Sequence, residues 1–532
     1  MKFSAIVLSG RVCTGKSTLA NKLKERAAAS EIKSKHLIET RVGRTLSLRA
    51  LLAETKKLEE ATNGRWLKEA VSRYLLDDRR SSPLLVVDSA RTVEQVRGLR
   101  ELGGRVLHVH LQAGDAALKQ RYEGIAPAPK PSFSSVLRRG AEAEDSLAGA
   151  SDVVIDTQRC NPADVLARVR ARFEPNPVTA NATVDVLVGG QYGSEGKGNI
   201  AHYLAPEYDV LVRVGGPNAG HMVYRHNDKP YTFRQIPSGF LGNQGAMLVI
   251  GAGAVIGLET LRKEIGELQI TPDNLIIDPQ AMIIEDEDVQ WEVDNLKNAI
   301  GSTAQGIGKA TSRKILNRHT SVRLVKDEPL LKPFERDTVE YFASCLSGGK
   351  RIMLEGTQGT LLSLHHGFYP HVTSRATSAA ACLAEAGLTQ RHVRKVIMVC
   401  RTYPIRVGDS VTGMTSGYMG KNIEFAEIAA RSGVPLAEIE KTEIGSVSKR
   451  KRRIAEFDWE LLRRALLLNG PTDLALTFAD YLGVENQKAY RYEQLTDETQ
   501  RFIGELEKVS GLPVSLISTA FNERNIVDRR MW

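Results

Sequence analysis

The chain has 532 residues, more than one ordinary domain holds, so two or more hydrophobic cores are expected. Its composition, 42% hydrophobic, 25% charged and 6% aromatic, is that of a soluble globular protein, and no apolar run approaches the roughly 20 residues that a membrane span needs. The net charge of +9 suits polyanionic ligands, phosphorylated molecules or nucleic acid, although a basic surplus of this size also occurs as ordinary solvated surface.

The cysteines argue against a disulfide framework or a zinc site, because they are odd in number, scattered and without a CxxC spacing: Cys13, Cys160, Cys345, Cys382 and Cys400. The short apolar stretch 3–8 follows a single lysine and runs directly into a glycine loop, which argues against a signal peptide. We therefore expect a cytoplasmic protein with no membrane partner.

Apolar runs alternate with helical patterns over the first 173 residues. The runs 5–8, 84–87, 106–109 and 153–155 are typical of buried strands, and 17–26 has helical spacing. Such alternation predicts a parallel sheet with helices on both faces.

The first glycine loop, residues 10–17, matches the pattern GxxxxGK[ST] and lies between a predicted strand and a predicted helix. Glycines let backbone N–H groups face phosphates, the lysine reaches the terminal phosphates, and the serine can hold Mg²⁺. Asp88, at the end of a strand, is placed as the carboxylate of the metal's outer shell. The pattern also permits a fold that keeps the loop but has lost catalysis. The predicted phosphate-site residues are Gly10, Gly15, Lys16, Ser17 and Asp88.

This first segment, about 170 residues, resembles small nucleoside monophosphate kinases and dephospho-coenzyme A kinase-like proteins. The resemblance depends on the loop, on Asp88 with Arg91, and on the pair Arg138-Arg139, which would form a lid over phosphate. Paired arginines on a helix are more often plain surface, and the acceptor of a kinase reaction cannot be identified from the sequence.

A linker is predicted at 174–182, where two prolines and small polar residues interrupt both periodicities. Strand-like runs then resume at 184–188, 210–214, 247–250, 352–354 and 396–399. The predicted fold is therefore α/β with two domains, each a mostly parallel sheet with flanking helices: a P-loop kinase-like domain at 1–173 and a second domain at 183–532.

The second glycine loop, residues 189–199, also follows a strand but is not the same motif, because Lys197 is followed by Gly198 rather than by serine or threonine. Glycines around a lysine make a phosphate-binding turn plausible, although glycine loops also serve tight packing.

Together with six segments further along the chain, this loop resembles the adenylosuccinate synthetase family, whose signature at the loop is GxQWGDEGKGK. The six segments match the family patterns NAGH, IPSG, IGNG, GTTxRGIGP, EGAQGTLLD and YPYVTS in order, and chance does not produce seven ordered blocks. The matching segments are 189–199, 216–221, 236–239, 250–253, 301–308, 355–362 and 369–374.

The resemblance implies a ligase that phosphorylates the 6-oxygen of a purine nucleotide and then displaces phosphate with the amino group of L-aspartate. It implies that His221 is the general acid, although a lone histidine is more often structural. It also implies a catalytic Lys197 at the γ-phosphate and Mg²⁺ near Ser194 and the Gly220 carbonyl. The loop residues implied at the triphosphate are Gly193, Glu195, Gly196 and Gly198, and those at the purine monophosphate are Asn218, Thr303, Gln358 and Thr373.

The basic run 449–453 has two interpretations. Five basic residues in a row usually form a solvated face or a nucleic-acid patch. In the resembled family, arginines of this loop bind the carboxylates of L-aspartate, a bidentate pairing that suits guanidinium. We favour the substrate role, carried by Arg450 and Arg452 with help from Ser448.

One departure from the family concerns Ser194, which stands where the family has an aspartate that takes the N1 proton and binds Mg²⁺. A hydroxyl cannot act as that base at neutral pH. Either the protein is inactive on inosinate, or the base has moved, or the purine differs. Serine leaves room for a 2-amino group, and phage relatives that use deoxyguanylate carry serine there, which raises GMP or dGMP as the substrate.

Two further departures concern the donor and the dimer. Asp480 of the family's guanine-reading KxD is present, but Phe478 replaces the lysine, so GTP as donor is in doubt and ATP is possible. The arginine that the family lends across its homodimer falls near Arg318.

The sequence thus predicts an adenylosuccinate synthetase-like, Mg²⁺-dependent ligase acting on IMP or on GMP/dGMP, fused to a P-loop kinase-like domain. The alternative is a purine-nucleotide-binding regulatory protein that does not ligate L-aspartate, which the loss of the aspartate base supports. A nucleic-acid-binding role is disfavoured, because no platform of paired aromatic and basic residues is present.

Overall fold

The computed structural model describes residues 4–27, 29–46, 48–76, 84–124, 132–134, 141–173, 181–224, 229–320, 322–409, 415–445, 450–520 and 525–530. The chain divides into two compact units, Met1–Asn176 and Pro177–Trp532, at a point inside the predicted linker. Residues 174–180 of that linker, Arg138-Arg139 of the predicted lid and Ser448 lie outside the described residues. Within the described part of the chain, no helix is both long and apolar enough to cross a membrane.

The first unit is built on a five-stranded parallel sheet with the strand order β2-β3-β1-β4-β5. Its strands are β1 (Ser4–Ser9), β2 (Ser30–Lys33), β3 (Leu84–Asp88), β4 (Arg105–Gln112) and β5 (Val153–Asp156). Its helices are α1 (Lys16–Ala27), α2 (Ser34–Val42), α3 (Leu48–Thr62), α4 (Arg65–Leu75), α5 (Val93–Arg100), α6 (Asp115–Glu123), α8 (Ala141–Gly149) and α9 (Pro162–Phe173).

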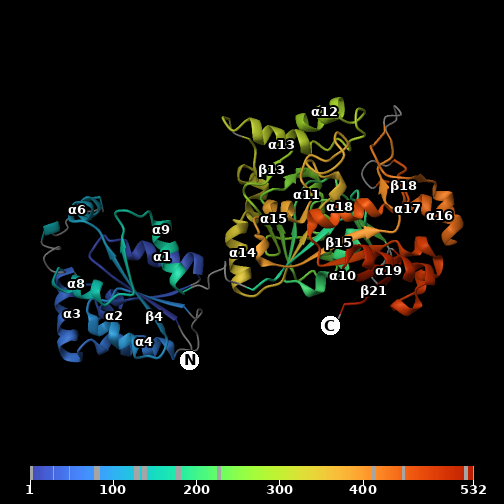
Figure 1. Cartoon of the computed structure of the whole chain (residues 1–532). Coiled ribbons are helices and arrows are strands. Elements are labelled where there is room, and N and C mark those ends of the chain that lie inside the picture. The colour runs from blue at the N-terminus through green and yellow to red at the C-terminus, as the bar shows by residue number, and fades with distance from the viewer. Residues whose placement is uncertain are drawn as a thin grey trace. The chain divides into compact units, whose positions relative to one another are not determined.

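The second unit is built on a nine-stranded sheet with the order β12-β10-β7-β14-β6-β15-β19-β20-β21, parallel except for the last pair. The strands are β6 (Val184–Gly189), β7 (Val210–Arg213), β10 (Met247–Ile250), β12 (Leu275–Ile277), β14 (Ile352–Glu355), β15 (Val393–Arg401), β19 (Asp473–Thr477), β20 (Val514–Ser518) and β21 (Ile526–Asp528). Figure 1 shows helices around the sheet of each unit, which confirms the predicted α/β class.

Short strands and helices complete the second unit. The short strands are β8 (His221–Tyr224) with β9 (Pro230–Phe233), β11 (Val255–Ile256) with β13 (Met282–Ile283), and β16 (Ile405–Arg406), β18 (Arg453–Ala455) and β17 (Asn422–Ile423). The helices are α10 (Lys197–Leu204), α11 (Leu258–Leu268), α12 (Asp286–Asn295), α13 (Ile307–Leu316), α14 (Thr338–Ser347), α15 (Ala379–Ala386), α16 (Phe425–Ser432), α17 (Leu436–Thr442), α18 (Trp459–Asn469) and α19 (Asp497–Ser510). Short 3₁₀ turns lie at Ala205–Glu207, Ser238–Leu241, Val325–Asp327, Pro329–Phe334, Thr360–Leu362, Gln390–His392, Ala479–Leu482, Val484–Lys488 and Tyr492–Gln494.

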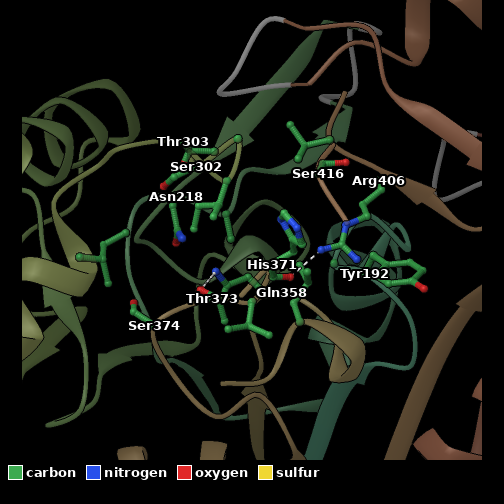
Figure 2. A pocket seen from close by; sticks show the side chains of 18 of the residues that line it. Tyr192, Asn218, Ser302, Thr303, Gln358, His371, Thr373, Ser374, Arg406 and Ser416 are labelled. Carbon is green, nitrogen blue, oxygen red and sulfur yellow. Dashed lines mark hydrogen bonds between the residues drawn. The ribbon is translucent and has the colours of Figure 1, made fainter. Parts of the chain in front are cut away.

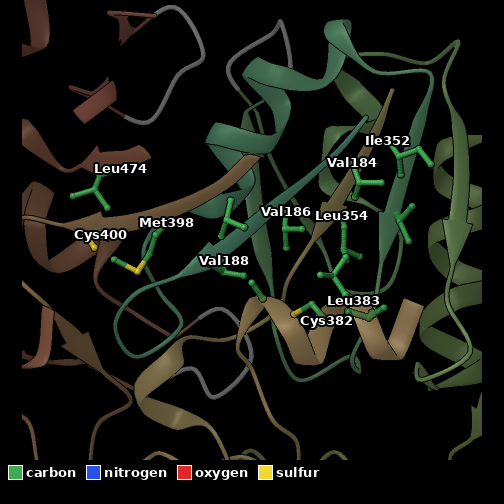
Figure 3. Close-up of a cluster of buried hydrophobic side chains, with 14 of the residues drawn as sticks. Val184, Val186, Val188, Ile352, Leu354, Cys382, Leu383, Met398, Cys400 and Leu474 are labelled. Carbon is green, nitrogen blue, oxygen red and sulfur yellow. The ribbon is translucent and has the colours of Figure 1, made fainter. Parts of the chain in front are cut away.

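Alternate residues of the buried strands supply the cores on the two faces of each sheet, as the period of two along a strand requires. In β6, Val184, Val186 and Val188 pack into one cluster, shown in Figure 3, whereas Leu187 packs into the cluster on the opposite face. Because both faces are covered, these strands are apolar along most of their length, which made them recognisable in the sequence.

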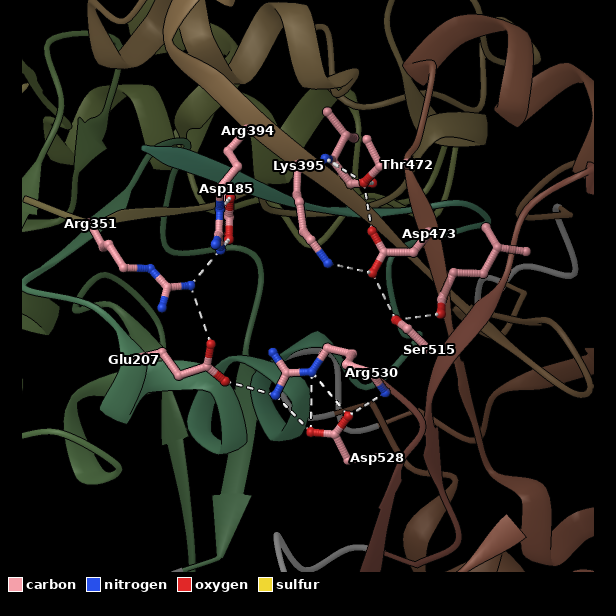
Figure 4. A network of polar contacts seen from close by, with 12 residues as sticks. Asp185, Glu207, Arg351, Arg394, Lys395, Thr472, Asp473, Ser515, Asp528 and Arg530 are labelled. Atoms are coloured by element: carbon pink, nitrogen blue, oxygen red, sulfur yellow. Dashed lines mark hydrogen bonds and ion pairs between the residues drawn. The ribbon is translucent and has the colours of Figure 1, made fainter. Parts of the chain in front are cut away.

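A polar network lies at the amino ends of the central strands, opposite the glycine loop. Figure 4 shows Asp185 of β6 paired with Arg394 of β15, and Arg351 reaching Glu207 at 3.2 Å. Arg530, the last residue that the structure describes, binds the same Glu207 at 2.7 Å. The network therefore anchors the C-terminal segment at one edge of the sheet and leaves the carboxyl edge to the functional groups.

Candidate functional site

The first glycine loop joins β1 to α1 and holds its lysine by backbone carbonyls. Lys16 Nζ donates to the carbonyls of Gly10 and Arg11, both at 2.7 Å. Gly10 has a φ of +125°, and a Cβ there would lie 2.0 Å from the Leu111 carbonyl oxygen, so only glycine fits. Burial lowers the pKa of Lys16 to about 8, although Asp88 opposes this.

The predicted metal-site residues of the first unit come together. The Ser17 hydroxyl donates to the Asp88 carboxylate, with 3.2 Å between the oxygens. Hydroxyl and carboxylate oxygens suit Mg²⁺ bound beside phosphates, so these residues fit the predicted ion. Asp88 ends β3, next to β1 in the sheet, which explains why residues 71 positions apart meet.

A cavity of about 530 Å³ opens beside this loop. The sequence did not indicate which residues outside the loop line it. Arg121 of α6 lines it and donates to the Thr157 hydroxyl at 2.9 Å and to the Cys13 carbonyl at 3.2 Å. These bonds fix the guanidinium against the glycine loop, in the wall of the cavity. This cavity, called here the P-loop cavity, carries the loop lysine and Arg121 in its lining, which suits an anionic ligand.

The second glycine loop joins β6 to α10 and is braced from within by Glu195. This carboxylate is almost fully buried and accepts from the backbone N–H groups of Gln191 at 3.0 Å and Gly193 at 2.8 Å. Lys197, the first residue of α10, donates to Glu195 Oε2 at 2.7 Å and to the Gly193 carbonyl at 3.2 Å. Glu195, predicted at the triphosphate, therefore lies inside the loop, where it positions Lys197.

His221 begins β8 and faces two charged groups at the carboxyl ends of neighbouring strands. Its Nδ1 contacts the carboxylate of Glu355 and lies 3.1 Å from Nη1 of Arg213. Burial and then the charge of Arg213 lower the pKa of His221 to about 4, against the opposing effect of Glu355. Burial raises the pKa of Glu355, but Arg213 and His221 outweigh it and leave a value of about 2. The ionised carboxylate of Glu355 can therefore stabilise the ring of His221 in its protonated form.

The other ring nitrogen of His221 faces a narrow cavity of about 90 Å³. Nε2 is buried and has no hydrogen-bond partner among the described residues. Lys197 and Ser194 line the same narrow cavity, so the three predicted catalytic residues are brought together. An unsatisfied buried nitrogen beside a lysine and a helix N-terminus is suited to an anionic ligand.

A wide cavity of about 330 Å³ lies on the other side of Ser194. Gln358 donates to the Thr373 hydroxyl at 2.6 Å, and both side chains line this cavity together with Asn218 and Thr303 (Figure 2). The four residues predicted at the purine monophosphate therefore line one space. Gly193, Ser194, Gly220 and Arg452 line both cavities, so the two spaces meet at the second loop.

Arg406, Tyr192 and His371 also line the wide cavity, and the sequence did not single them out (Figure 2). Arg406 donates to the His371 carbonyl at 2.5 Å, and its guanidinium lies 4.9 Å from the centre of the Tyr192 ring. Arg406 follows the predicted strand 396–399 by only a few residues, and a charged residue there is the signal that could have indicated it.

The two arginines predicted to bind L-aspartate are placed differently. Arg452 lines both cavities and donates to Glu443 at 3.1 Å. Arg450 donates to the carbonyls of Gly301 at 2.9 Å and Asp409 at 3.3 Å, and it is not among the residues that line either cavity. Arg452 is therefore the arginine of the basic run that faces the cavities directly.

The far end of the narrow cavity holds Asp480 and Phe478. Burial raises the pKa of Asp480 to about 6, and its Oδ1 has no hydrogen-bond partner among the described residues. Arg401, missed by the sequence reasoning, stacks on the Phe478 ring at 3.7 Å and donates to the Ser194 carbonyl at 3.3 Å. Arg318 lies elsewhere, exposed in the turn after α13.

The second unit is similar in sequence to known proteins. The family model described as adenylosuccinate synthetase matches residues 186–330 and 319–489. The adenylosuccinate synthetase of Methanococcus aeolicus is 36% identical over 355 residues, covering 65% of this chain and 100% of the relative. That of Methanocaldococcus jannaschii is 37% identical, covering 65% and 97%.

Two solved structures are similar to the same part. The adenylosuccinate synthetase of Plasmodium falciparum has a TM-score of 0.56 at 23% identity, covering 65% of this chain and 100% of that one, which is a likeness of fold. The succinoaminodeoxyadenylate synthetase of cyanophage S-2L, bound to dGMP and to dATP as an energy donor, has a TM-score of 0.54 at 27% identity, covering 66% and 96%.

Proposed function

The chain belongs to the adenylosuccinate synthetase family, and we propose that its second unit joins L-aspartate to a 6-oxopurine nucleotide, with a nucleoside triphosphate as phosphate donor. The observation that carries this proposal is the meeting of the two cavities at Ser194, beside the unsatisfied Nε2 of His221. The purine nucleotide would occupy the wide cavity and the triphosphate the narrow one, so that the 6-oxygen and the γ-phosphate meet at the second loop.

In the first step the 6-oxygen attacks the γ-phosphorus, and the nucleoside diphosphate leaves. Lys197 and the amides at the start of α10 would hold the transferring phosphoryl group. Because a bound phosphate anion opposes the effect of Arg213, it would raise the pKa of His221 and let Nε2–H donate to the 6-oxygen, with Glu355 as counter-charge. In the second step the amino group of L-aspartate attacks C6, and phosphate leaves with the oxygen.

The residues around the second loop fit Mg²⁺ bound mainly through phosphates. The Ser194 hydroxyl and the Gly220 carbonyl are neutral oxygens at the junction of the cavities, and both line the narrow cavity. The ion would supply positive charge at the triphosphate. Arg452, with Arg450 and Ser448, would bind the carboxylates of L-aspartate, and a homodimer would supply Arg318 to the neighbouring subunit's nucleotide.

We propose further that the purine carries a 2-amino group, as in guanylate or deoxyguanylate. Ser194 is shorter than the aspartate of the family pattern and uncharged, which leaves space beside the purine's C2. The cyanophage protein, similar in fold and 27% identical, was solved with dGMP bound. With serine at 194, the N1 proton needs an acceptor other than residue 194.

Steady-state kinetics of three proteins on guanylate and inosinate tests this choice. We expect the natural protein to prefer guanylate, and Ser194→Asp to move the ratio of kcat/KM toward inosinate by at least tenfold, about 1.4 kcal/mol. Ser194→Asn is the matched control, because it has the size of aspartate without its charge or basicity: it should lose guanylate activity without gaining inosinate activity. If the natural protein prefers inosinate and Ser194→Asp leaves this preference unchanged, Ser194 does not select a purine with a 2-amino group.

For the first unit we propose triphosphate binding and phosphoryl transfer of the P-loop kinase type. The support is the loop geometry at Lys16, the Ser17–Asp88 contact suited to Mg²⁺, and the P-loop cavity beside them. The acceptor would be a further nucleotide or a related phosphate acceptor.

A further inference from the structure

A buried carboxylate that the sequence did not single out connects Arg452 with Arg401. Glu443 follows directly after α17, and its side chain is 1% exposed. Its Oε1 accepts from Arg401 Nη2 at 2.5 Å and from the Tyr481 hydroxyl at 2.9 Å. Its Oε2 accepts from Arg452 Nη1 at 3.1 Å. One carboxylate therefore binds two guanidinium groups, and a neutral hydroxyl adds a third hydrogen bond to it.

The two arginines and Glu443 together carry a surplus of positive charge. Burial acts to raise the pKa of Glu443, but the charges of Arg401 and Arg452 outweigh it and lower the pKa below its ordinary value. The ionised carboxylate balances only one of the two cations. The side chain of Arg401 is 1% exposed, whereas that of Arg452 is 17% exposed and lines both cavities. The surplus charge therefore faces the cavities through Arg452, where an anionic ligand would balance it.

Glu443 holds Arg452 by the backbone as well as by the side chain. The N–H of Arg452 donates to the Glu443 carbonyl at 3.0 Å, and the adjacent residues Ile444 and Lys451 form an antiparallel bridge. A guanidinium tied at both ends of its residue has few alternative positions. Its bond to Glu443 uses Nη1, which leaves the other donors of the planar group for a ligand.

Arg401 connects Glu443 to the second glycine loop. Its guanidinium donates to the Ser194 carbonyl at 3.3 Å as well as to Glu443. Its backbone N–H donates to Gln191 Oε1 at 3.0 Å, and Gln191 Nε2 donates to the Arg401 carbonyl at 3.1 Å. Arg401 is also the last residue of β15, in the middle of the sheet. The position of Arg452 is therefore set relative to the loop at which the two cavities meet.

Resting on the proposed function, we propose that Glu443 is a positioning residue that selects the amino-acid substrate by its length. It fixes the guanidinium of Arg452 at the distance from the junction of the cavities at which L-aspartate can bind with its amino group at the purine. L-glutamate is one methylene longer, so its amino group and its carboxylate cannot both be in place. A mobile arginine would follow either carboxylate, whereas a fixed one can discriminate by roughly 10–200-fold for one methylene.

A competition between the two amino acids in one reaction tests this proposal. The full chain is incubated with Mg²⁺, ATP and GTP, equal amounts of L-aspartate and L-glutamate, and either guanylate or inosinate. Mass spectrometry then measures the ratio of the two adducts, which differ by one methylene. This ratio does not depend on how much of the protein is folded, so a merely structural role would not change it. We expect at least fiftyfold more of the L-aspartate adduct from the natural protein, within the range for one methylene. Glu443→Gln should lower this ratio at least tenfold, because both guanidinium groups lose their counter-ion.

The matched control is Glu385→Gln, because Glu385 binds Arg375 at 2.6 Å and neither residue lines a cavity. This variant should melt at a lower temperature and keep the natural ratio. Tyr481→Phe removes only one hydrogen bond to Glu443 and should lower the ratio a few-fold.

The outcomes separate this proposal from the proposed reaction. If the natural protein forms the L-aspartate adduct and Glu443→Gln leaves the ratio unchanged, Glu443 does not select the amino acid, while the ligase reaction stands. If Glu443→Gln does not fold, an unchanged ratio in Tyr481→Phe has the same meaning. If the natural protein forms no adduct from either purine, the proposed reaction is wrong, and the role of Glu443 is wrong with it.

Discussion

In the first unit the lysine of the glycine loop is held by two backbone carbonyls, whereas in the second unit it is paired with a carboxylate of its own loop. Lys16 Nζ lies 2.7 Å from the oxygens of Gly10 and Arg11, and Lys197 Nζ lies 2.7 Å from Glu195. Both lysines begin a helix that follows a buried strand. The two loops therefore share a backbone design and differ in charge.

This difference indicates how each loop would meet a triphosphate. Lys16 donates to carbonyls rather than to a carboxylate of its own loop, and phosphate oxygens can replace these contacts. The charge of Lys197 has a counter-ion before any ligand binds, because burying a cation without one costs free energy. The second loop consequently depends on helix amides, on His221 and on Arg452 for much of its attraction. Under the proposed functions, the same phosphate-binding architecture would serve transfer to different acceptors.

The largest effect is expected at the residue that distinguishes the second site from the first. His221→Ala should lower ligation by roughly 10²–10⁴-fold, because the 6-oxygen loses its acid. Binding of the purine monophosphate in the wide cavity should survive, since His221 does not line that cavity. Single-turnover kinetics together with calorimetry measure the two quantities. A variant with unchanged ligation would remove His221 from the mechanism.

A second substitution tests whether the loops act independently. Lys16→Ala should weaken triphosphate binding by the first unit roughly 10²-fold, the loss of about 3 kcal/mol from a charged hydrogen bond. In the natural protein this affinity should also fall a few-fold between pH 7 and pH 9, because the lowered pKa leaves Lys16 neutral above about 8. Ligation by the second unit should remain measurable, and its disappearance would show that the two units share one reaction.

The smallest effect is expected from removing the charge that distinguishes the second loop. Glu195→Gln keeps acceptors for the Gln191 and Gly193 amides but leaves Lys197 without its counter-ion. The unliganded second unit should melt at a lower temperature, and triphosphate should raise that temperature more than in the natural protein, with binding a few-fold tighter. Thermal unfolding in a Lys16→Ala background measures this. If Glu195→Gln changes neither the melting temperature nor its rise on addition of triphosphate, the expected role of the pair between Glu195 and Lys197 is wrong.

The sequence predicted the sheets well where strands are buried on both faces. Runs such as 184–188 and 396–399 lie in β6 and β15, because both faces of these strands need apolar side chains. β19 and β20 were not predicted, although Leu474 and Leu516 are fully buried, since their runs are short and interrupted by polar residues. Register and strand order depend on contacts between segments hundreds of residues apart, which periodicity does not report.

The sequence predicted those residues of the candidate site that belong to a motif. It did not predict the single charged residues that contribute to the site. Gln358 and Thr373 were predicted from the resemblance of segments 355–362 and 369–374 to family motifs, and they bond to each other. Arg213, Glu355 and Arg401 were not assigned a role, yet each ends a parallel strand, the position from which side chains reach a site at the sheet's carboxyl edge. Their roles arise from mutual contacts that only the folded chain creates.

The reaction that we propose for the second unit forms a succinyl adduct on a 2-amino purine nucleotide. The most direct measurement incubates the full chain with L-aspartate, Mg²⁺ and a matrix of purine monophosphates and triphosphates, and detects succinyl adducts by mass spectrometry. We expect an adduct from guanylate or deoxyguanylate, formed faster than any adduct from inosinate. Adducts from inosinate alone would contradict the role given to Ser194, and no adduct from any purine would identify a nucleotide-binding protein that does not ligate L-aspartate.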